Sequence, residues 1–149
     1  MEIKKTTNPK DIQAANDLVK QDKNTQLKDA TSIDNSYKSL AGIDEELFTI
    51  KINSTLIGFI VTRIYRDHND TSAEIYKIFI DVKYRKNDYA TNALNHIYSY
   101  FQKEKISEIM VEMLPGTQSF WSKHINSNHF SLSKDSSHEY DNKVTYFIK

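Results

Sequence analysis

The chain of 149 residues contains no cysteine and has only three glycines and two prolines. The absence of cysteine excludes disulfide scaffolds, thiol nucleophiles, cysteine-ligated zinc sites and iron–sulfur clusters. Because glycine and proline are scarce, most breaks between helices and strands have to be identified from clusters of asparagine, aspartate and serine. The sequence therefore favours a chain that folds around an apolar core without covalent or metal cross-links.

Long apolar segments are missing as well. The longest apolar run covers residues 56–61, which suits a strand and falls far short of the roughly 18 residues of a membrane span. The first ten residues carry positive charges without an apolar stretch, so we expect no signal peptide, no membrane partner and a cytoplasmic location. Basic and acidic residues balance at 20 each, whereas nucleic-acid binders usually show a basic excess. We therefore expect no nucleic acid among the partners.

The length predicts one domain over residues 1–149. Residues 3–7 suit a short strand, and the Asn8-Pro9 pair is typical of a helix start, with a capping side chain followed by proline in the first turn. An apolar stripe at helical spacing follows that pair, and a second stripe predicts another helix over residues 27–40.

The middle of the chain alternates between strand and helix patterns. Residues 47–52 and 56–65 are rich in β-formers and predict a hairpin, and residues 73–82 predict a third strand. Apolar residues then recur along one helical face over 90–101, and residues 108–114 predict another strand. A strand, a helix and a second strand in this order form a right-handed crossover between parallel strands.

The C-terminal part predicts a short helix over residues 117–123 and two strands, over 130–133 and 143–148. The fold class that follows is α/β (mixed α+β). We expect a central mixed sheet of about six or seven strands with helices on both faces.

The turn into the helix at 90–101 carries the most informative motif. Residues 85–90 are Arg-Lys-Asn-Asp-Tyr-Ala, and this segment resembles the acyl-CoA loop of the GNAT (N-acetyltransferase) superfamily, Arg/Gln-x-x-Gly-x-Gly/Ala. Arg85 and Ala90 match its first and last positions, and Tyr84 and Thr91 fit its flanking preferences. The resemblance implies an N-acetyltransferase that uses acetyl-CoA as acyl donor, needs no metal and acts on an amine acceptor that the sequence does not identify.

Physical chemistry supports an anion site at this turn. A loop that opens a helix presents unpaired backbone N–H groups at the positive end of the helix dipole. By resemblance, the pantetheine arm of CoA lies between the diverging strands 78–82 and 109–112. The backbone of two residues, Phe79 and Ile80, holds the thioester end. The loop contacts are Arg85, Lys86, Asn87, Asp88, Tyr89, Ala90 and Thr91.

Asp88 departs from the motif, because the family has glycine there. Its carboxylate brings negative charge to the expected pyrophosphate position. A like-charge pair about 4 Å apart costs about 1 kcal/mol in water, and about 4 kcal/mol at an effective dielectric constant of about 20. The alternative interpretation is a helix N-cap, in which the Asp88 side chain bonds to the N–H groups of the first turn. In this second arrangement, the side chain occupies the same N–H donors that the phosphate would use.

A second departure follows the strand at 108–114. The family often has Asn-x-x-Ala-x-x-Phe-Tyr there, in which the tyrosine gives a proton to the leaving thiolate. Aligned on Phe120, this chain has Leu114, Thr117 and Trp121 at the Asn, Ala and Tyr positions. An indole N–H is a poor proton donor, which leaves Tyr89 or water as the candidate acid.

Glu74 is the candidate general base. Strand alternation would place it on one face with Tyr76, Ile78, Ile80 and Val82, close to the expected site of acyl transfer. The alternative is an ordinary strand glutamate that is exposed or paired with a lysine. The five histidines lack metal-ligand spacing, so we expect no metal site.

Two functions are compatible with these residues. The first is the N-acetyltransferase, which acts as a monomer or a homodimer on a small-molecule or peptide amine. The second is a non-catalytic relative that binds acyl-CoA or a protein partner without turnover. Asp88 and Trp121 are the features that favour the second function.

Overall fold

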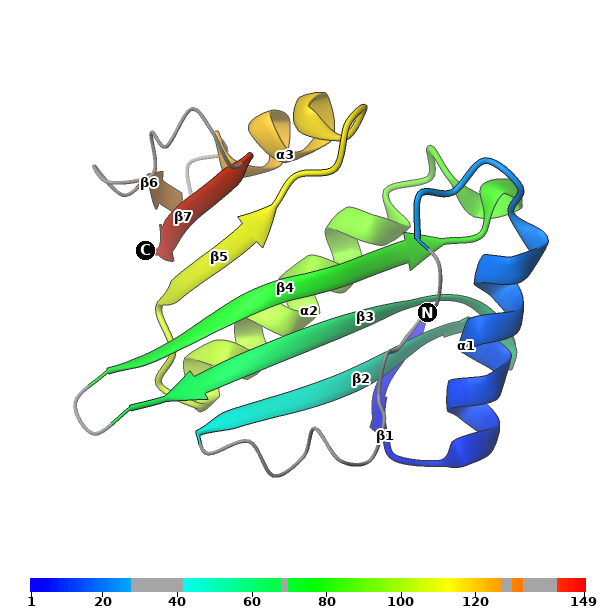
Figure 1. The fold of residues 1–149 in the computed structure, drawn as a ribbon, viewed down its shortest axis with the longest axis horizontal. Helices are drawn as coiled ribbons and strands as arrows, with labels where there is room; N and C mark the ends of the chain where they lie inside the picture. Colours follow the sequence, from blue (N-terminus) through cyan, green and yellow to red (C-terminus); the bar gives the residue numbers. More distant parts are fainter. Residues whose placement is uncertain (28–41, 68–69, 127–129, 133–141) are drawn as a thin grey trace.

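The computed structural model describes residues 1–27, 42–67, 70–126, 130–132 and 142–149, and these form one seven-stranded sheet with three α-helices (Figure 1). The strands are β1 (Glu2–Thr6), β2 (Ile43–Ile52), β3 (Thr55–Arg66), β4 (Thr71–Ile80), β5 (Glu108–Glu112), β6 (Phe130–Leu132) and β7 (Lys143–Ile148). The helices are α1 (Pro9–Gln21), α2 (Tyr89–Lys103) and α3 (Gln118–Ile125), and a short 3-10 helix covers Val82–Tyr84.

The strands lie in the order β1-β2-β3-β4-β5-β7-β6. Among the described strands, β4 and β5 are the one parallel pair, and α2 connects them as the crossover. This confirms the predicted mixed sheet. The helix predicted over 27–40 lies almost entirely outside the described residues.

Local sequence explains where the first elements begin and turn. The Asn8 side chain accepts a hydrogen bond from the Lys10 N–H at 3.0 Å, and Pro9 opens α1, so the predicted cap is confirmed. The hairpin between β2 and β3 turns on Asn53 and Ser54, both with positive φ (47° and 66°). Two consecutive left-handed residues are typical of the tight turns that match the twist of paired strands.

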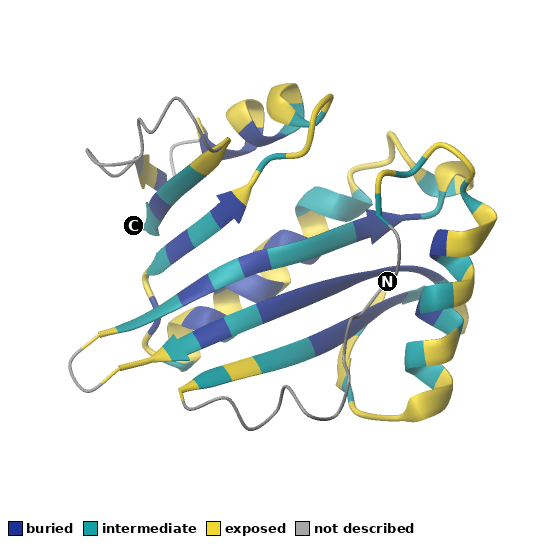
Figure 2. Ribbon diagram, viewed as in Figure 1, coloured by how far each residue is buried: buried dark blue, intermediate teal, exposed yellow. Residues whose placement is uncertain are grey.

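Two apolar clusters pack on opposite faces of the sheet (Figure 2). The larger joins the sheet to α2, whose Leu94, Ile97 and Phe101 are fully buried. The smaller joins Ala15 and Val19 of α1 to the other face. Helices on both faces were predicted, and this arrangement confirms them.

A bulge in β4 corrects the predicted alternation. Val61 of β3 pairs with Lys77, but the next residue of β3 pairs with Ile75, so Tyr76 is an extra residue in β4. Ile78 and Ile80 therefore belong to the α2-side cluster, whereas Tyr76 packs with the α1-side cluster. The prediction that Glu74 shares a face with Ile78, Ile80 and Val82 is wrong, because it assumed an unbroken period of two.

The end of β4 also differs from the prediction. The strand ends at Ile80, and Asp81 caps the 3-10 helix that follows by accepting a hydrogen bond from the Lys83 N–H at 3.1 Å. Val82 is thus part of a turn and 60% exposed rather than part of the strand. Across the described ranges, no helix is both long and apolar enough to cross a membrane.

Candidate active site

The parallel strands β4 and β5 separate toward their C-terminal ends (Figure 1). Their pairing runs from Ser72 with Glu108 to Ile75 with Val111 and goes no further. The opening was predicted between residues 78–82 and 109–112, and the β5 side of that prediction is wrong. Residues 108–111 are paired with β4, so the opening on that side begins after Val111.

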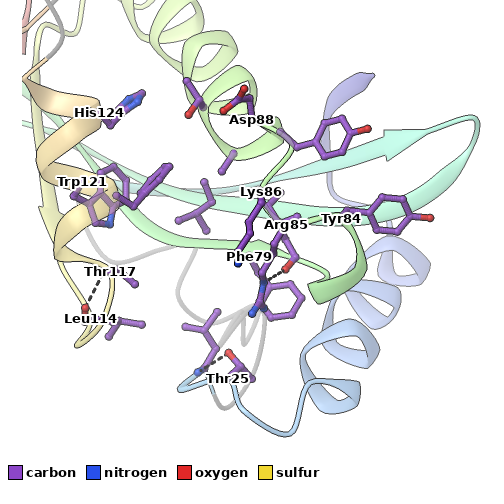
Figure 3. Close-up of a pocket in the computed structure, with 18 of the residues that line it drawn as sticks. Thr25, Phe79, Tyr84, Arg85, Lys86, Asp88, Leu114, Thr117, Trp121 and His124 are labelled. Atoms are coloured by element: carbon purple, nitrogen blue, oxygen red, sulfur yellow. Dashed lines mark hydrogen bonds between the residues drawn. The ribbon is translucent and has the colours of Figure 1, made fainter.

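The opening between the strands is a cavity of about 740 Å³ (Figure 3). Four parts of the chain line it: residues 24–27, the end of β4, the loop into α2 with the first turns of that helix, and the segment from Leu114 through α3. Of the residues predicted to bind the acyl donor, the lining includes Phe79, Ile80, Arg85, Lys86, Asp88, Tyr89, Ala90 and Thr91. One topological opening therefore brings together most of the residues singled out from sequence.

Asn87 is the member of that predicted set that does not line the cavity. Its side-chain amide donates to the carbonyl oxygens of Tyr84 and Arg85, at 3.3 and 3.1 Å. Asn87 therefore stabilises the loop conformation, and its side-chain amide bonds to the loop backbone rather than lining the cavity.

Asp88 occupies the N-cap position of α2 without acting as a side-chain cap. Its backbone is left-handed (φ 58°, ψ 9°), and its carboxylate makes no capping hydrogen bond. Capping side chains need an extended backbone at this position, so the left-handed turn directs the carboxylate away from the first-turn N–H groups. The N-cap interpretation of Asp88 is therefore wrong. The side chain leaves those donors free and faces the cavity instead.

Arg85 points toward the end of β4. Its Nε donates to the Ile80 carbonyl oxygen at 2.7 Å, and its Nη2 donates to Asp22 Oδ2 at 2.5 Å. The guanidinium also lies 5.4 Å from the centre of the Phe79 ring. Lys86, which has a positive φ of 65°, follows it along the cavity wall.

The β5 side of the cavity is mostly apolar. Trp121 is 3% exposed and packs edge-on against Phe120, with ring centres 5.2 Å apart. Leu114 is 37% exposed at the cavity, and its carbonyl oxygen accepts a hydrogen bond from Thr117 Oγ1 at 2.7 Å. At the three positions where the family often has Asn, Ala and Tyr, this wall offers one hydroxyl and two apolar side chains.

Two parts of the site were missed by sequence reasoning. Residues 24–27 line the cavity, and Gln26 Nε2 donates to the Pro115 carbonyl oxygen at 2.9 Å, across 89 positions of sequence. A short polar segment with no periodicity carried no signal for this contact.

The second missed feature is a buried polar chain behind the cavity. The Tyr98 hydroxyl lies 2.8 Å from His124 Nε2 and 2.7 Å from the Tyr146 hydroxyl. Burial lowers the pKa of His124, which favours a neutral imidazole. His124 lines the cavity, and it is joined through Tyr98 of α2 to Tyr146 of β7.

Glu74 lies outside the cavity lining, on the other side of the bulge from Ile78. Tyr65 donates a hydrogen bond to its Oε2 at 2.7 Å, and Arg63 is its cross-strand neighbour. Burial, then the bond to Glu74, raise the pKa of Tyr65 to about 12. Glu74 therefore has one hydrogen-bond donor, the Tyr65 hydroxyl, and a cationic neighbour, Arg63.

Arg63 lies between the Glu45 carboxylate and the Tyr76 ring on this face. Its Nε donates to Glu45 Oε2 at 2.8 Å, and its guanidinium lies 3.3 Å from the centre of the Tyr76 ring. We refer to Glu45, Arg63, Tyr65, Glu74 and Tyr76 as the polar row. Within the ranges that the structure describes, no group of three or more potential metal ligands was found, in the polar row or elsewhere.

Comparison with known proteins identifies relatives of this architecture. The sequence model of the acetyltransferase (GNAT) family matches residues 13–123, and a search of curated proteins found no match. The structure is similar to GCN5 from Tetrahymena (TM-score 0.71, 15% identity), over 100% of this chain and 97% of that chain. It is also similar to Ard1 from Thermoplasma volcanium (TM-score 0.63, 15% identity), over 99% of this chain and 97% of that chain.

A third similar structure is a NatC complex bound to Gag peptide and CoA. Its TM-score is 0.62 at 19% identity, over 99% of this chain and 96% of that chain. At identities this low, the structural similarities establish the fold alone.

Proposed function

The chain belongs to the acetyltransferase (GNAT) family, and from this membership we propose that it is an acetyl-CoA-dependent N-acetyltransferase. Its acceptor would be an amine of a small molecule or a peptide. The observation that carries the proposal is the cavity where β4 and β5 separate, which opens beside the uncapped N-terminus of α2.

Most residues at this end of the cavity suit the phosphate groups of an acyl-CoA. The start of α2 keeps its first-turn N–H groups free of side-chain caps, and such groups bind phosphate well. Lys86 adds a positive charge along the same wall. Asp88 is the one feature that opposes an anion there, because its carboxylate also faces the cavity.

The β4 edge suits the pantetheine arm. Beyond Ile75 the strand has no pairing with β5, so its backbone polar groups on that side are available to amides of a ligand. Gly58 of β3 fixes this part of β4 from the other side. A Cβ at Gly58 would lie 2.3 Å from the Phe79 carbonyl oxygen, so glycine allows β3 to approach that backbone closely. The backbone of Phe79 and Ile80 would hold and polarise the thioester carbonyl.

Glu74 would take the proton of the acceptor. Bound acetyl-CoA would supply a thioester, and the acceptor nitrogen would bond to the acetyl carbon as its bond to sulfur breaks. An amine reacts only when unprotonated, so a carboxylate on this face assists by accepting the ammonium proton, directly or through water. Because Glu74 lies four residues before Ile78 on β4 and outside the cavity lining, we propose the route through water.

The departing sulfur needs one proton. Trp121 lines the cavity where the family often has tyrosine, and its indole does not exchange a proton readily. Tyr89 is the phenol at the start of α2, and it also lines the cavity with its ring 6.5 Å from that of Tyr84. We propose Tyr89 or water as the donor.

A second function deserves a test because Asp88 faces the cavity. A carboxylate at the phosphate position and an indole at the acid position would suit a family member that has lost turnover. Such a protein would bind acyl-CoA weakly, or bind a protein partner, without transferring an acyl group.

The test is thermal unfolding across a titration of acetyl-CoA, with Asp88→Asn and Asp88→Gly as comparisons. Ligand at about a hundred times its dissociation constant stabilises by about 2.7 kcal/mol, and the expected rise in Tm is roughly 5–10 °C. Asp88→Asn removes the charge alone, whereas Asp88→Gly also removes the Cβ. A saturable rise in the native protein supports the enzyme, and acetyl-CoA consumption is then measured against a panel of amines. A rise that occurs only in the two variants would favour the second function.

A further inference from the structure

The carboxylate of Asp22 joins parts of the chain that are far apart in sequence. Asp22 is the C-cap of α1, and its side chain is 7% exposed. Its Oδ2 accepts the hydrogen bond from Arg85 Nη2, and its Oδ1 accepts one from the Asn24 N–H at 3.0 Å. The first bond crosses 63 positions of sequence, so it fixes the end of α1 against the loop that leads into α2.

Arg85 connects Asp22 to the end of β4. The same guanidinium that Asp22 binds also donates from Nε to the Ile80 carbonyl oxygen. Arg85 is the first residue of the acyl-CoA motif, but its two hydrogen bonds go to protein groups. The guanidinium therefore links Asp22 to the Ile80 backbone, and this suits a structural role better than direct binding of a phosphate.

Asp22 also begins the segment that forms one wall of the cavity. Its Oδ1 shapes the turn at Asn24, and residues 24–27 then cross to the β5 side, where Gln26 bonds to the Pro115 carbonyl oxygen. The segment is therefore attached on the β4 side through Asp22 and on the β5 side through Gln26. These two attachments set the spacing between the walls of the opening.

We infer that Asp22 is a positioning residue of the acyl-CoA site, which acts through Arg85 on the Ile80 backbone and through Asn24 on the cavity wall. The inference rests on the proposed function for the identity of the ligand. The pKa of Asp22 is lowered, first by the Asn24 N–H and then by Arg85, so the carboxylate is ionised at neutral pH.

Asp22→Asn tests the inference, and Asp17→Asn is the matched control. Asp17 lies in α1 and is bonded to Gln13 Nε2 at an exposed position away from the cavity. We expect Asp22→Asn to raise the Kd for acetyl-CoA about tenfold, measured by calorimetry, because coupled neighbours typically change affinity by this order. At saturating acetyl-CoA, kcat should stay within about twofold, whereas Asp17→Asn should change neither quantity.

Arg85→Gln and the double variant show whether Asp22 acts through Arg85. If it does, adding Asp22→Asn to Arg85→Gln raises the Kd by clearly less than the product of the two single effects. Independent effects that simply multiply would overturn the route through Arg85. A lower Tm for Asp22→Asn with an unchanged Kd would reduce Asp22 to a stabilising role and overturn the inference.

A readout without ligand separates this inference from the proposed function. In NMR spectra of the free protein, the Arg85 Nε–H should exchange slowly with solvent. It should lose that protection in Asp22→Asn, together with shifts of the amides of residues 78–80. Unchanged signals would overturn the inference even if acetyl-CoA binds. If acetyl-CoA does not bind the native protein, the proposed function fails, while these signals still decide whether Asp22 positions Arg85.

Discussion

The two faces of the sheet differ in what they bury. On the α2 face, twenty buried residues form one apolar cluster that runs across the sheet from Phe48 to Tyr146. On the α1 face, the described residues form a cluster of only six buried members, and the remainder of the face carries the polar row. The chain thus concentrates its buried apolar residues on the α2 face, and the ion pair between Arg63 and Glu45 lies on the α1 face.

This division follows from strand geometry. Successive side chains of a strand point to opposite faces, so β3 can bury Ile64 under α2 while the adjacent Arg63 and Tyr65 face the other way. An apolar face tolerates no unpaired charge, whereas a face only half covered by a helix can hold ion pairs. The polar row accordingly lies on the α1 face, whereas the cavity lies at the C-terminal end of β4 and includes no member of that row.

The strongest test of the division is a truncation on the α2 face. Phe101→Ala removes a fully buried ring and should lower the free energy of unfolding by about 3–5 kcal/mol. Val19→Ala in the smaller cluster should lower it by about 1.5 kcal/mol. Denaturant unfolding measures both. Equal losses would mean that the two faces contribute equally to stability.

The reverse test removes a charge from the polar row. Glu74→Gln should lower kcat/KM about a hundredfold, because a general base typically contributes that much. The free energy of unfolding should change by less than about 1 kcal/mol, since Glu74 is only partly buried. Glu2→Gln on β1 is an exposed-strand control and should leave both quantities unchanged. A kcat/KM that survives in Glu74→Gln would remove the residue from the mechanism.

Tyr65→Phe tests the hydrogen bond to Glu74, and we expect a smaller loss of kcat/KM than in Glu74→Gln. Its hydroxyl stays protonated over any practical assay range, because its pKa is about 12, so it always donates to Glu74. Losing this one hydrogen bond should lower kcat/KM about five- to tenfold. Steady-state kinetics at fixed pH measure the effect. A larger loss than in Glu74→Gln would show that Tyr65 acts on the substrate itself.

The smallest expected effect concerns the one buried histidine of the α2 face among the described residues. His124 has a lowered pKa because burial disfavours its charged form. Below about pH 6.5 the unfolded chain binds a proton that the folded protein resists, so stability should fall as the pH drops through this range. Tm measured from pH 8 to 5 should decline less steeply in His124→Gln than in the native protein. Parallel curves would show that other groups cause the decline.

The sequence carried enough information for the fold and for part of the site. The apolar spacing of α2 and the strands on either side of it predicted the parallel crossover. That crossover places residues 85–86 and 88–91 beside the cavity. These are local patterns, and each is repeated over several residues. The resemblance of residues 85–90 to the family motif led to the prediction of an acyl-CoA ligand.

The parts that sequence missed depend on single backbone events or on long-range contacts. The extra residue Tyr76 shifted the alternation of β4, and the left-handed backbone of Asp88 removed its capping bond. Neither event leaves a repeated pattern. The bonds from Asp22 to Arg85 and from Gln26 to Pro115 join residues 63 and 89 positions apart, which no local pattern encodes.

The sheet order has a consequence for self-association. Its two outer strands are β1 and β6, and an exposed strand edge is the usual template for adding a second chain and starting a fibril. β1 places Glu2, Lys4 and Lys5 on that edge, and β6 spans only three residues. Within the part of the chain that the structure describes, neither edge offers a long, flat, apolar strand, so we expect concentrated solutions of the folded protein to resist growth by strand addition.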